Sequence, residues 1–148
     1  MLNGIDVSSN NRGLSIQSVK ADVVIVKATE GTTYVNPQFE RQAGDTLDSG
    51  KLLGIYHYAH NDVIAEADYF LSKVGDYLGK AVLVLDWEAT AALAAGVGAA
   101  KKWLDYVYAK TGVKPLLYTG LSVESRRGLA SFGFLCVSHA WFQCRIMS

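Results

Sequence analysis

The stretch that most constrains the fold is Ala81–Glu88, in which an apolar run ends in two carboxylates on either side of a tryptophan. Its aliphatic and β-branched residues predict a strand that is buried on both faces in the middle of a sheet. Because side chains alternate along a strand, Asp86 and Glu88 point to the same face, about 7 Å apart along the strand axis. Either acid alone could cap the following helix. Two acids on one face favour a functional site, since unpaired buried carboxylates are costly.

Other parts of the chain alternate between strand and helix patterns. Strands are expected at 3–7, 22–28, 51–60, 81–88 and 114–119, and helices at 36–50, 67–78 and 89–110. The first helix is expected to be capped by Asn36 and to bury Leu47, and the second is expected to bury Leu78. This alternation predicts βα units, a parallel sheet and right-handed crossovers.

Polar residues collect where the predicted strands end: Asp6, Glu30, Tyr58, Asp86, Glu88 and Tyr118. The C-terminal ends of parallel strands lie on one rim of a barrel, so this pattern is typical of a barrel-type enzyme. His57 falls on the face opposite Tyr58, which favours a packed core histidine. Trp87 points away from the two acids, and we expect it to pack beneath the helices.

Composition limits the possible functions. A chain of 148 residues suits one domain, and its 14 basic and 14 acidic residues show no basic patch of the kind that nucleic acids require. We expect no nucleic-acid partner and no membrane span, because no apolar run approaches about 20 residues. The N-terminus shows no signal-peptide pattern. The two cysteines, Cys136 and Cys144, form neither a disulfide framework nor a zinc motif.

The last residues differ in composition from the rest. All 14 acidic residues lie at or before Glu124, whereas 125–148 contains both cysteines and three arginines, without clear periodicity. We therefore divide the chain into 1–124, the N-terminal part of a barrel, and an atypical tail, 125–148. The tail is either a sixth strand with a short terminus or a truncated or frameshifted segment.

Several short motifs occur together in an order and spacing that resembles family 25 of the glycoside hydrolases: Gly4–Ser8, Val26–Gly31, Gly54–Ala59, Leu85–Glu88 and Pro115–Gly120. The chain is similar to the catalytic domain of a muramidase, as found in phage endolysins and bacterial autolysins. The resemblance implies an α/β fold, an irregular TIM-like (β/α) barrel, with a peptidoglycan groove at the C-terminal rim. It implies no cofactor and no metal. Later strands of the family are not recognisable after Gly120, so the barrel is expected to be incomplete at its C-terminus, although Trp141 is present.

The resemblance also implies roles for individual residues. Glu88 matches the family's acid, Asp86 its neighbouring carboxylate and Asp6 its N-terminal acid. Glycosidic cleavage needs a proton donor and a stabilised oxocarbenium-like centre. We therefore expect Glu88 to protonate the β-1,4 oxygen between N-acetylmuramic acid and N-acetylglucosamine, with Asp86 and Asp6 as ionised partners. They would assist either a water molecule or the substrate's acetamido group.

Substrate contacts are expected from Tyr58, Tyr118 and Glu30, although barrel-interior tyrosines and a structural Glu30 are alternatives. The resemblance implies action on the bacterial cell wall, by a protein that is extracellular or released through a holin or lysis.

Two other functions remain open at this stage. The chain could be a catalytically silent fragment that at most binds cell-wall glycan, with its open sheet edges pairing in a homodimer. It could also be a metal-dependent hydrolase that uses Asp6, Asp86, Glu88 and His60, although no paired-histidine motif supports this function.

Overall fold

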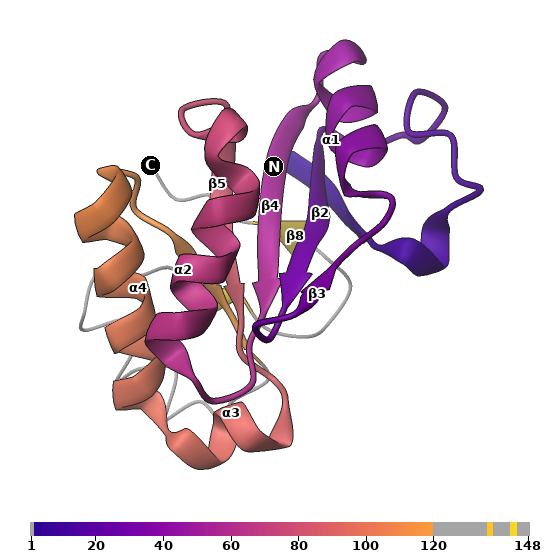
Figure 1. Ribbon diagram of the computed structural model, residues 1–148. Helices are drawn as coiled ribbons and strands as arrows, with labels where there is room; N and C mark the ends of the chain where they lie inside the picture. Colours follow the sequence, from indigo (N-terminus) through magenta and orange to yellow (C-terminus); the bar gives the residue numbers. More distant parts are fainter. Residues whose placement is uncertain (1, 120–135, 138–142, 145–148) are drawn as a thin grey trace.

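The computed structural model describes residues 2–119, 136–137 and 143–144, and strands and helices alternate within them (Figure 1). The strands are β1 (Leu2–Val7), β2 (Val23–Glu30), β3 (Tyr34–Val35), β4 (Leu52–Tyr58), β5 (Ala81–Asp86), β6 (Leu116–Tyr118), β7 (Cys136–Val137) and β8 (Gln143–Cys144). The α-helices are α1 (Phe39–Asp48), α2 (Val63–Val74), α3 (Thr90–Ala95) and α4 (Val97–Thr111). Short 3-10 helices lie at Ser9–Asn11 and Gly75–Tyr77.

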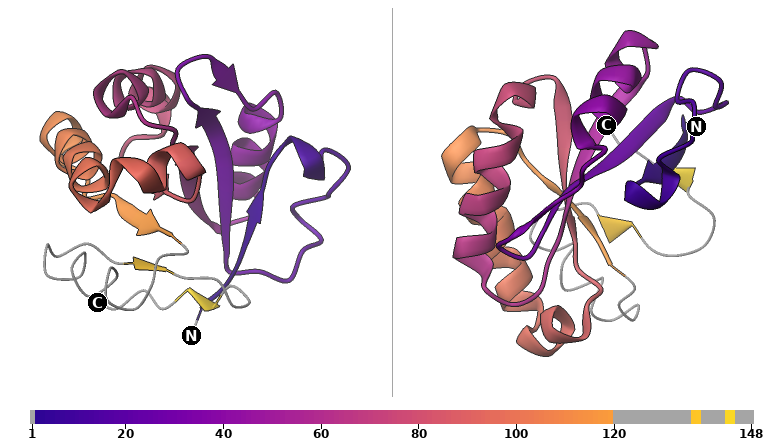
Figure 2. Two further views of the ribbon diagram at one scale, coloured as in Figure 1. Left: turned by 90° about the horizontal axis from the view of Figure 1, so that it is seen from below. Right: turned by 45° about the vertical axis from the view of Figure 1, so that its right-hand side comes forward.

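The strands form one sheet in the order β7-β6-β5-β4-β2-β1-β8, with β3 paired to the end of β2. Neighbours from β1 to β7 pair in parallel, whereas β3 and β8 run antiparallel to their partners. The sheet curls into part of a barrel, and α1, α2 and α4 lie outside the curl (Figure 2). The α/β class and the TIM-like architecture expected from the sequence are confirmed.

The two faces of the sheet bury different apolar residues. The helix-covered face carries the larger core, which includes Val24, Val26, Ile55, Leu83, Leu85 and Leu117 together with Phe70, Trp103 and Leu104 from the helices. Trp87 is 1% exposed in this core, as predicted. The concave face holds a smaller cluster of Val23, Ile25 and Val84, with Tyr56, Leu116 and Tyr118 packed against it. This smaller cluster forms an apolar floor inside the curl.

An irregularity in β2 changes which face its last residues occupy. Lys27 and Thr29 pair with consecutive residues of β4, so one extra residue lies between them as a bulge. Thr29 consequently turns toward the helices, where its hydroxyl lies 2.8 Å from His57 Nδ1. Glu30 lies on the concave side, where its carboxylate is 2.6 Å from Lys27 Nζ. Strict alternation would have placed Lys27 and Glu30 on opposite faces.

The start of the first helix differs from the prediction. The helix begins at Phe39 with Gln38 as its N-cap, and Asn36 precedes it. Asn36 is buried, and its side-chain amide donates to the Lys27 carbonyl oxygen at 2.9 Å, while its side-chain oxygen accepts from the Gln38 N–H at 3.0 Å. Asn36 therefore ties the turn to β2, because a buried amide must satisfy both its donor and its acceptor.

Two residues that were predicted to be buried are exposed. Leu47 is 36% exposed, because Thr46 takes the inward position and donates its hydroxyl to the helix backbone. The second helix ends at Val74 rather than continuing, so Leu78 is 38% exposed. The stretch expected to be helical, 89–110, forms two helices that meet at Gly96, whose φ of 85° interrupts the helical path. Within the described residues, no helix combines the length and apolar character of a membrane span.

The described parts of the tail pair with both sides of the sheet. β7 lies parallel to β6, and β8 lies antiparallel to β1. The choice between a further strand with a short terminus and a truncated or frameshifted segment stays a prediction. The proposed boundary at residue 124 and Trp141 lie outside the described residues.

The floor inside the curl contains one glycine that we expect to be essential for packing. A Cβ atom on Gly54 would lie 3.0 Å from Ile25 Cγ1, tighter than most Cβ contacts in proteins, so Ile25 would have to shift. We predict that Gly54→Ala lowers the free energy of unfolding by about 1–3 kcal/mol through overpacking. Gly44 in α1 has nothing within 4 Å of the corresponding position, so Gly44→Ala should stabilise the protein by about 0.5–1 kcal/mol. Urea unfolding of both variants checks this, and a neutral Gly54→Ala would show that Ile25 has room to move.

Candidate active site

Asp86 and Glu88 lie on either side of Trp87, whose backbone is hydrogen-bonded to the end of β6. The Trp87 N–H donates to the Tyr118 carbonyl oxygen at 2.8 Å, and the Thr119 hydroxyl donates to the Trp87 carbonyl oxygen at 2.9 Å. Both backbone polar groups of Trp87 are thus tied to the end of β6, while the Trp87 ring is anchored in the helix-side core. Because the strand alternates, anchoring the tryptophan outward turns both carboxyls inward.

Both acids line a cavity of about 240 Å³ on the concave side of the sheet. Its walls also include Asp6 from β1, and the full lining consists of Asp6, Ile25, Tyr56, Val84, Asp86, Glu88 and Tyr118. The structure therefore brings together four of the six predicted site residues, from three strands and the segment after β5. Tyr58 and Glu30 lie outside this lining.

Tyr58 and Glu30 are nevertheless aligned with the acid pair. In the register of the sheet, Glu30 pairs with Tyr58, Tyr58 with Asp86, and Asp86 with Tyr118. These four residues form one row across β2, β4, β5 and β6. The row lies at the C-terminal edge of the parallel strands, the edge where barrel enzymes place their sites.

The Asp86 carboxyl is buried, with 9% of its surface exposed. Burial raises its pKa to about 8, and both the negative charge of Glu88 and a hydrogen bond with Glu88 contribute to this increase. One carboxyl oxygen, Asp86 Oδ1, is buried without a hydrogen-bond partner among the described residues. Asp86 therefore retains its proton at neutral pH in the free protein. This differs from the expectation that Asp86 is ionised, because tertiary burial disfavours its charge.

Three tyrosines lie near the acids: Tyr56 and Tyr118 line the cavity, and Tyr58 is the register partner of Asp86. Burial raises the pKa of Tyr56, and the charges of Asp6 and Asp86 reinforce the shift. Burial and the charge of Glu88 raise the pKa of Tyr118 to about 12, and the pKa of Tyr58 is raised for the same reasons. All three hydroxyls stay protonated and available as donors. Tyr56 was not singled out from the sequence, although its alternation with Tyr58 on one face of the strand would have identified it.

Beside the acid pair, Glu30 is held by two basic side chains. Glu30 contacts Lys27 Nζ at 2.6 Å and His60 Nε2 at 3.1 Å. Burial alone raises the pKa of Glu30, but hydrogen bonds from these two partners bring it below its usual value. The Lys27 ammonium also lies over the rings of Tyr58 and Tyr34, 5.0 and 5.3 Å from their centroids. Glu30 is thus an ionised member of a charged cluster next to the row.

His57 belongs to the helix-side core and not to the cavity. It is fully buried, and its ring stacks on Trp103 with 5.8 Å between centroids. Within the part of the chain that the structure describes, no group of three or more His, Cys, Asp or Glu side chains is arranged to hold a metal ion.

The raised pKa of Asp86 leads to a prediction about stability. The folded protein retains a proton that the unfolded chain, with a carboxyl pKa of 3.8, has already released. Stability therefore falls as the pH rises from about 4 to about 8, by up to about 1.4 kcal/mol per pH unit from this group. We predict that Asp86→Asn removes this slope and is more stable than the wild type at pH 8. Urea unfolding between pH 4 and pH 9 measures the effect, with exposed Asp48→Asn as the control. An unchanged slope in Asp86→Asn would contradict the raised pKa.

Comparison with known sequences identifies relatives of the chain. The profile of "Glycosyl hydrolases family 25" matches residues 5–142. The chain is 37% identical over 139 residues to the N,O-diacetylmuramidase of Chalaropsis sp, a match that covers 80% of this chain and 66% of that protein. It is 34% identical over 131 residues to the uncharacterised protein YegX of Escherichia coli K12, of which it spans 48%. The chain thus spans between about half and two thirds of these relatives.

Solved structures share the fold. A family GH25 lysozyme from Aspergillus fumigatus superposes with a TM-score of 0.68 at 25% identity, covering 80% of this chain and 65% of that one. A bacterial lysozyme from Streptomyces coelicolor gives a TM-score of 0.68 at 26% identity, covering 86% of this chain and 66% of the other. Since the family profile extends over most of the sequence, including all the strands that line the cavity, the chain belongs to glycosyl hydrolases family 25.

Proposed function

We propose that this chain is a peptidoglycan hydrolase that cleaves the β-1,4 bond between N-acetylmuramic acid and N-acetylglucosamine. The observation that carries the proposal is one cavity with an apolar floor, which Asp86, Glu88 and Asp6 line together and in which burial raises the pKa of Asp86. Family membership and the muramidases and lysozymes among the relatives support this choice of substrate. The site of action would be the bacterial cell wall, and the pairing of two chains through sheet edges stays a prediction.

In this proposal Glu88 is the general acid. It lies on the segment after β5, is only partly buried, and is therefore more accessible to a glycan than Asp86. Asp86, which lies within hydrogen-bonding distance of Glu88, passes its retained proton to Glu88, and Glu88 gives it to the glycosidic oxygen as the bond to the anomeric carbon breaks. Both carboxyls are then ionised beside the cationic sugar, and this charge stabilises the oxocarbenium-like transition state. Asp6 adds a third carboxyl to the same cavity from β1.

The tyrosine hydroxyls would orient the sugar and the acids. Tyr118 flanks Asp86 on one side of the row and Tyr58 on the other, so a glycan that crosses the row would meet both. The group that attacks the cationic sugar is either a water molecule or the substrate's own acetamido group. Glu30, held by Lys27 and His60, would contact substrate as part of that charged cluster and not as an isolated acid.

The direct test is the release of reducing ends from purified peptidoglycan by the 148-residue chain. We expect new reducing ends at N-acetylmuramic acid, identified by borohydride reduction of the products and mass spectrometry. Reducing ends only at N-acetylglucosamine would assign the other glycosidic bond and overturn the proposal. A chain that is folded, shown by cooperative unfolding, and yet releases none would correspond to the alternative function, a catalytically silent glycan binder.

A further inference from the structure

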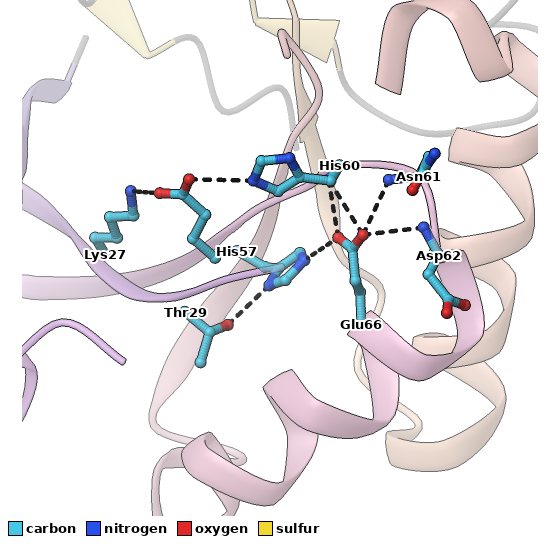
Figure 3. Close-up of polar contacts among 8 residues, drawn as sticks. Lys27, Thr29, His57, His60, Asn61, Asp62 and Glu66 are labelled. Carbon is cyan, nitrogen blue, oxygen red and sulfur yellow. Dashed lines mark hydrogen bonds and ion pairs between the residues drawn. The ribbon is translucent and has the colours of Figure 1, made fainter. Parts of the chain in front are cut away.

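A buried carboxylate outside the cavity organises the loop that follows β4. Glu66 of α2 is 2% exposed, and one of its oxygens lies 2.8 Å from His57 Nε2 (Figure 3). The same carboxylate accepts hydrogen bonds of 2.9–3.0 Å from three consecutive backbone N–H groups, those of His60, Asn61 and Asp62. A single side chain therefore fixes the whole connection between β4 and α2.

The charge state of this network follows from its burial. Burial lowers the pKa of His57, although Glu66 opposes the shift, so the imidazole is neutral. Burial alone raises the pKa of Glu66, but hydrogen bonds from His57 and from the backbone N–H groups of His60 and Asp62 hold it below its usual value. The ionised Glu66 therefore accepts from His57 Nε2–H, and His57 Nδ1 accepts from the Thr29 hydroxyl. The proton positions follow from Glu66, which can only accept hydrogen bonds.

The loop that Glu66 holds carries a side chain to the row of site residues. The His60 ring lies 3.1 Å from Glu30 Oε1 and packs edge-on against Tyr58, with 5.9 Å between ring centroids. Tyr58 in turn is the register partner of Asp86. The chain of contacts thus runs from Glu66 through the loop to His60, and from His60 to Tyr58, which borders Asp86, and to Glu30, the next residue along the row.

We propose that Glu66 is a positioning residue for the reaction: by holding the backbone of His60, Asn61 and Asp62 it places His60 against Glu30 and Tyr58, beside the acid pair. This inference rests on the proposed function. The charge of Glu66 would otherwise be unfavourable in the core, because a buried carboxylate stabilises a fold less well than apolar packing does. Hydrogen bonds to three consecutive N–H groups of one loop at the rim of the site explain why a carboxylate stands there.

The test uses Glu66→Gln, which keeps the size of the side chain but has one acceptor oxygen in place of two. Amide hydrogen exchange at His60, Asn61 and Asp62 should become at least about tenfold faster, because one oxygen cannot accept from all the donors. On peptidoglycan, kcat/KM should fall by about 10- to 100-fold, as expected when site residues move by about 1 Å. Should Glu66→Gln fail to fold, Glu66→Asp carries the same test, since its carboxylate is one carbon too short to reach the loop.

A double-mutant cycle distinguishes positioning from a general loss of stability. His60→Ala should lower kcat/KM to a similar extent, and Glu66→Gln combined with His60→Ala should be no worse than the more damaging single variant. Val74→Ala, at the other end of α2, destabilises the core without touching the loop and should leave kcat/KM within twofold. Multiplicative effects in the cycle, or an equal loss in Val74→Ala, would overturn the proposal.

The inference can fail separately from the proposed function. If the wild-type chain releases no reducing ends, the proposed activity is wrong. The positioning role is then judged by NMR, where Glu66→Gln and His60→Ala should shift the Tyr58 ring and Glu30 carboxyl resonances in the same direction. Resonances that stay at their wild-type positions in Glu66→Gln would overturn the positioning role, whatever the activity.

Discussion

Replacing Glu88 with glutamine should lower the rate of reducing-end release from peptidoglycan by about 10²–10⁴-fold, the usual contribution of general acid catalysis. Glutamine has the same shape but no proton to give to the leaving oxygen. It also removes the neighbouring negative charge that helps to raise the pKa of Asp86. We therefore expect kcat to fall, while KM changes by less than about threefold, because transition-state stabilisation is lost and ground-state binding is kept.

Glu40→Gln is the matched control. Glu40 lies on α1, is exposed, and can still accept the Tyr77 hydroxyl as glutamine. Its rate should equal that of the wild type. A variant at Glu88 that retains near-full activity, on a chain shown to be active, would mean that Asp86 or another group delivers the proton, and the assignment would then pass to the residue whose replacement abolishes turnover.

Trp103→Ala should lower the free energy of unfolding by about 3–5 kcal/mol, the largest stability effect that we expect from one substitution. Trp103 is fully buried in α4, where it stacks on His57 and packs against Phe70 with 5.5 Å between ring centroids. Alanine leaves a large cavity between α4 and the sheet. The substitution also removes the ring that packs against the neutral His57, which weakens the hydrogen bond that His57 donates to Glu66.

Tyr108→Ala provides the comparison on the same helix. Tyr108 is 50% exposed, so its replacement should change the unfolding free energy by less than about 0.5 kcal/mol. Urea unfolding followed by circular dichroism measures both variants. A loss in Trp103→Ala that is no larger than the loss in Tyr108→Ala would show that the core closes around the cavity. His57 and Phe70 would then have to repack against each other.

Much of the fold was predictable because apolar periodicity is a local property of the sequence. The strand patterns located β1, β2, β4, β5 and β6 within a few residues, and the two-residue alternation placed Asp86 and Glu88 on one face with Trp87 on the other. Helix details were less predictable. Leu47 and Leu78 looked like core residues from their spacing, but which turn of a helix reaches the sheet depends on where the helix begins and ends in space.

The candidate site was predictable in its components and only partly in its arrangement. Sequence pattern named Asp6, Asp86 and Glu88, and the structure places them in one cavity, but the inclusion of Tyr56 and the exclusion of Tyr58 follow from the curl of the sheet. Their catalytic roles stay predictions until the variants are measured.

By itself, the sequence determined which residues stand at the C-terminal ends of the strands, because alternation and turn signals act over a few neighbouring positions. Only the tertiary structure decided their chemical state. The proton retained by Asp86 depends on its burial and on the charge of Glu88, and the face on which Glu30 lies depends on the bulge before Thr29. Burial and cross-strand register are properties of the assembled sheet, and they arise only when distant segments pack together.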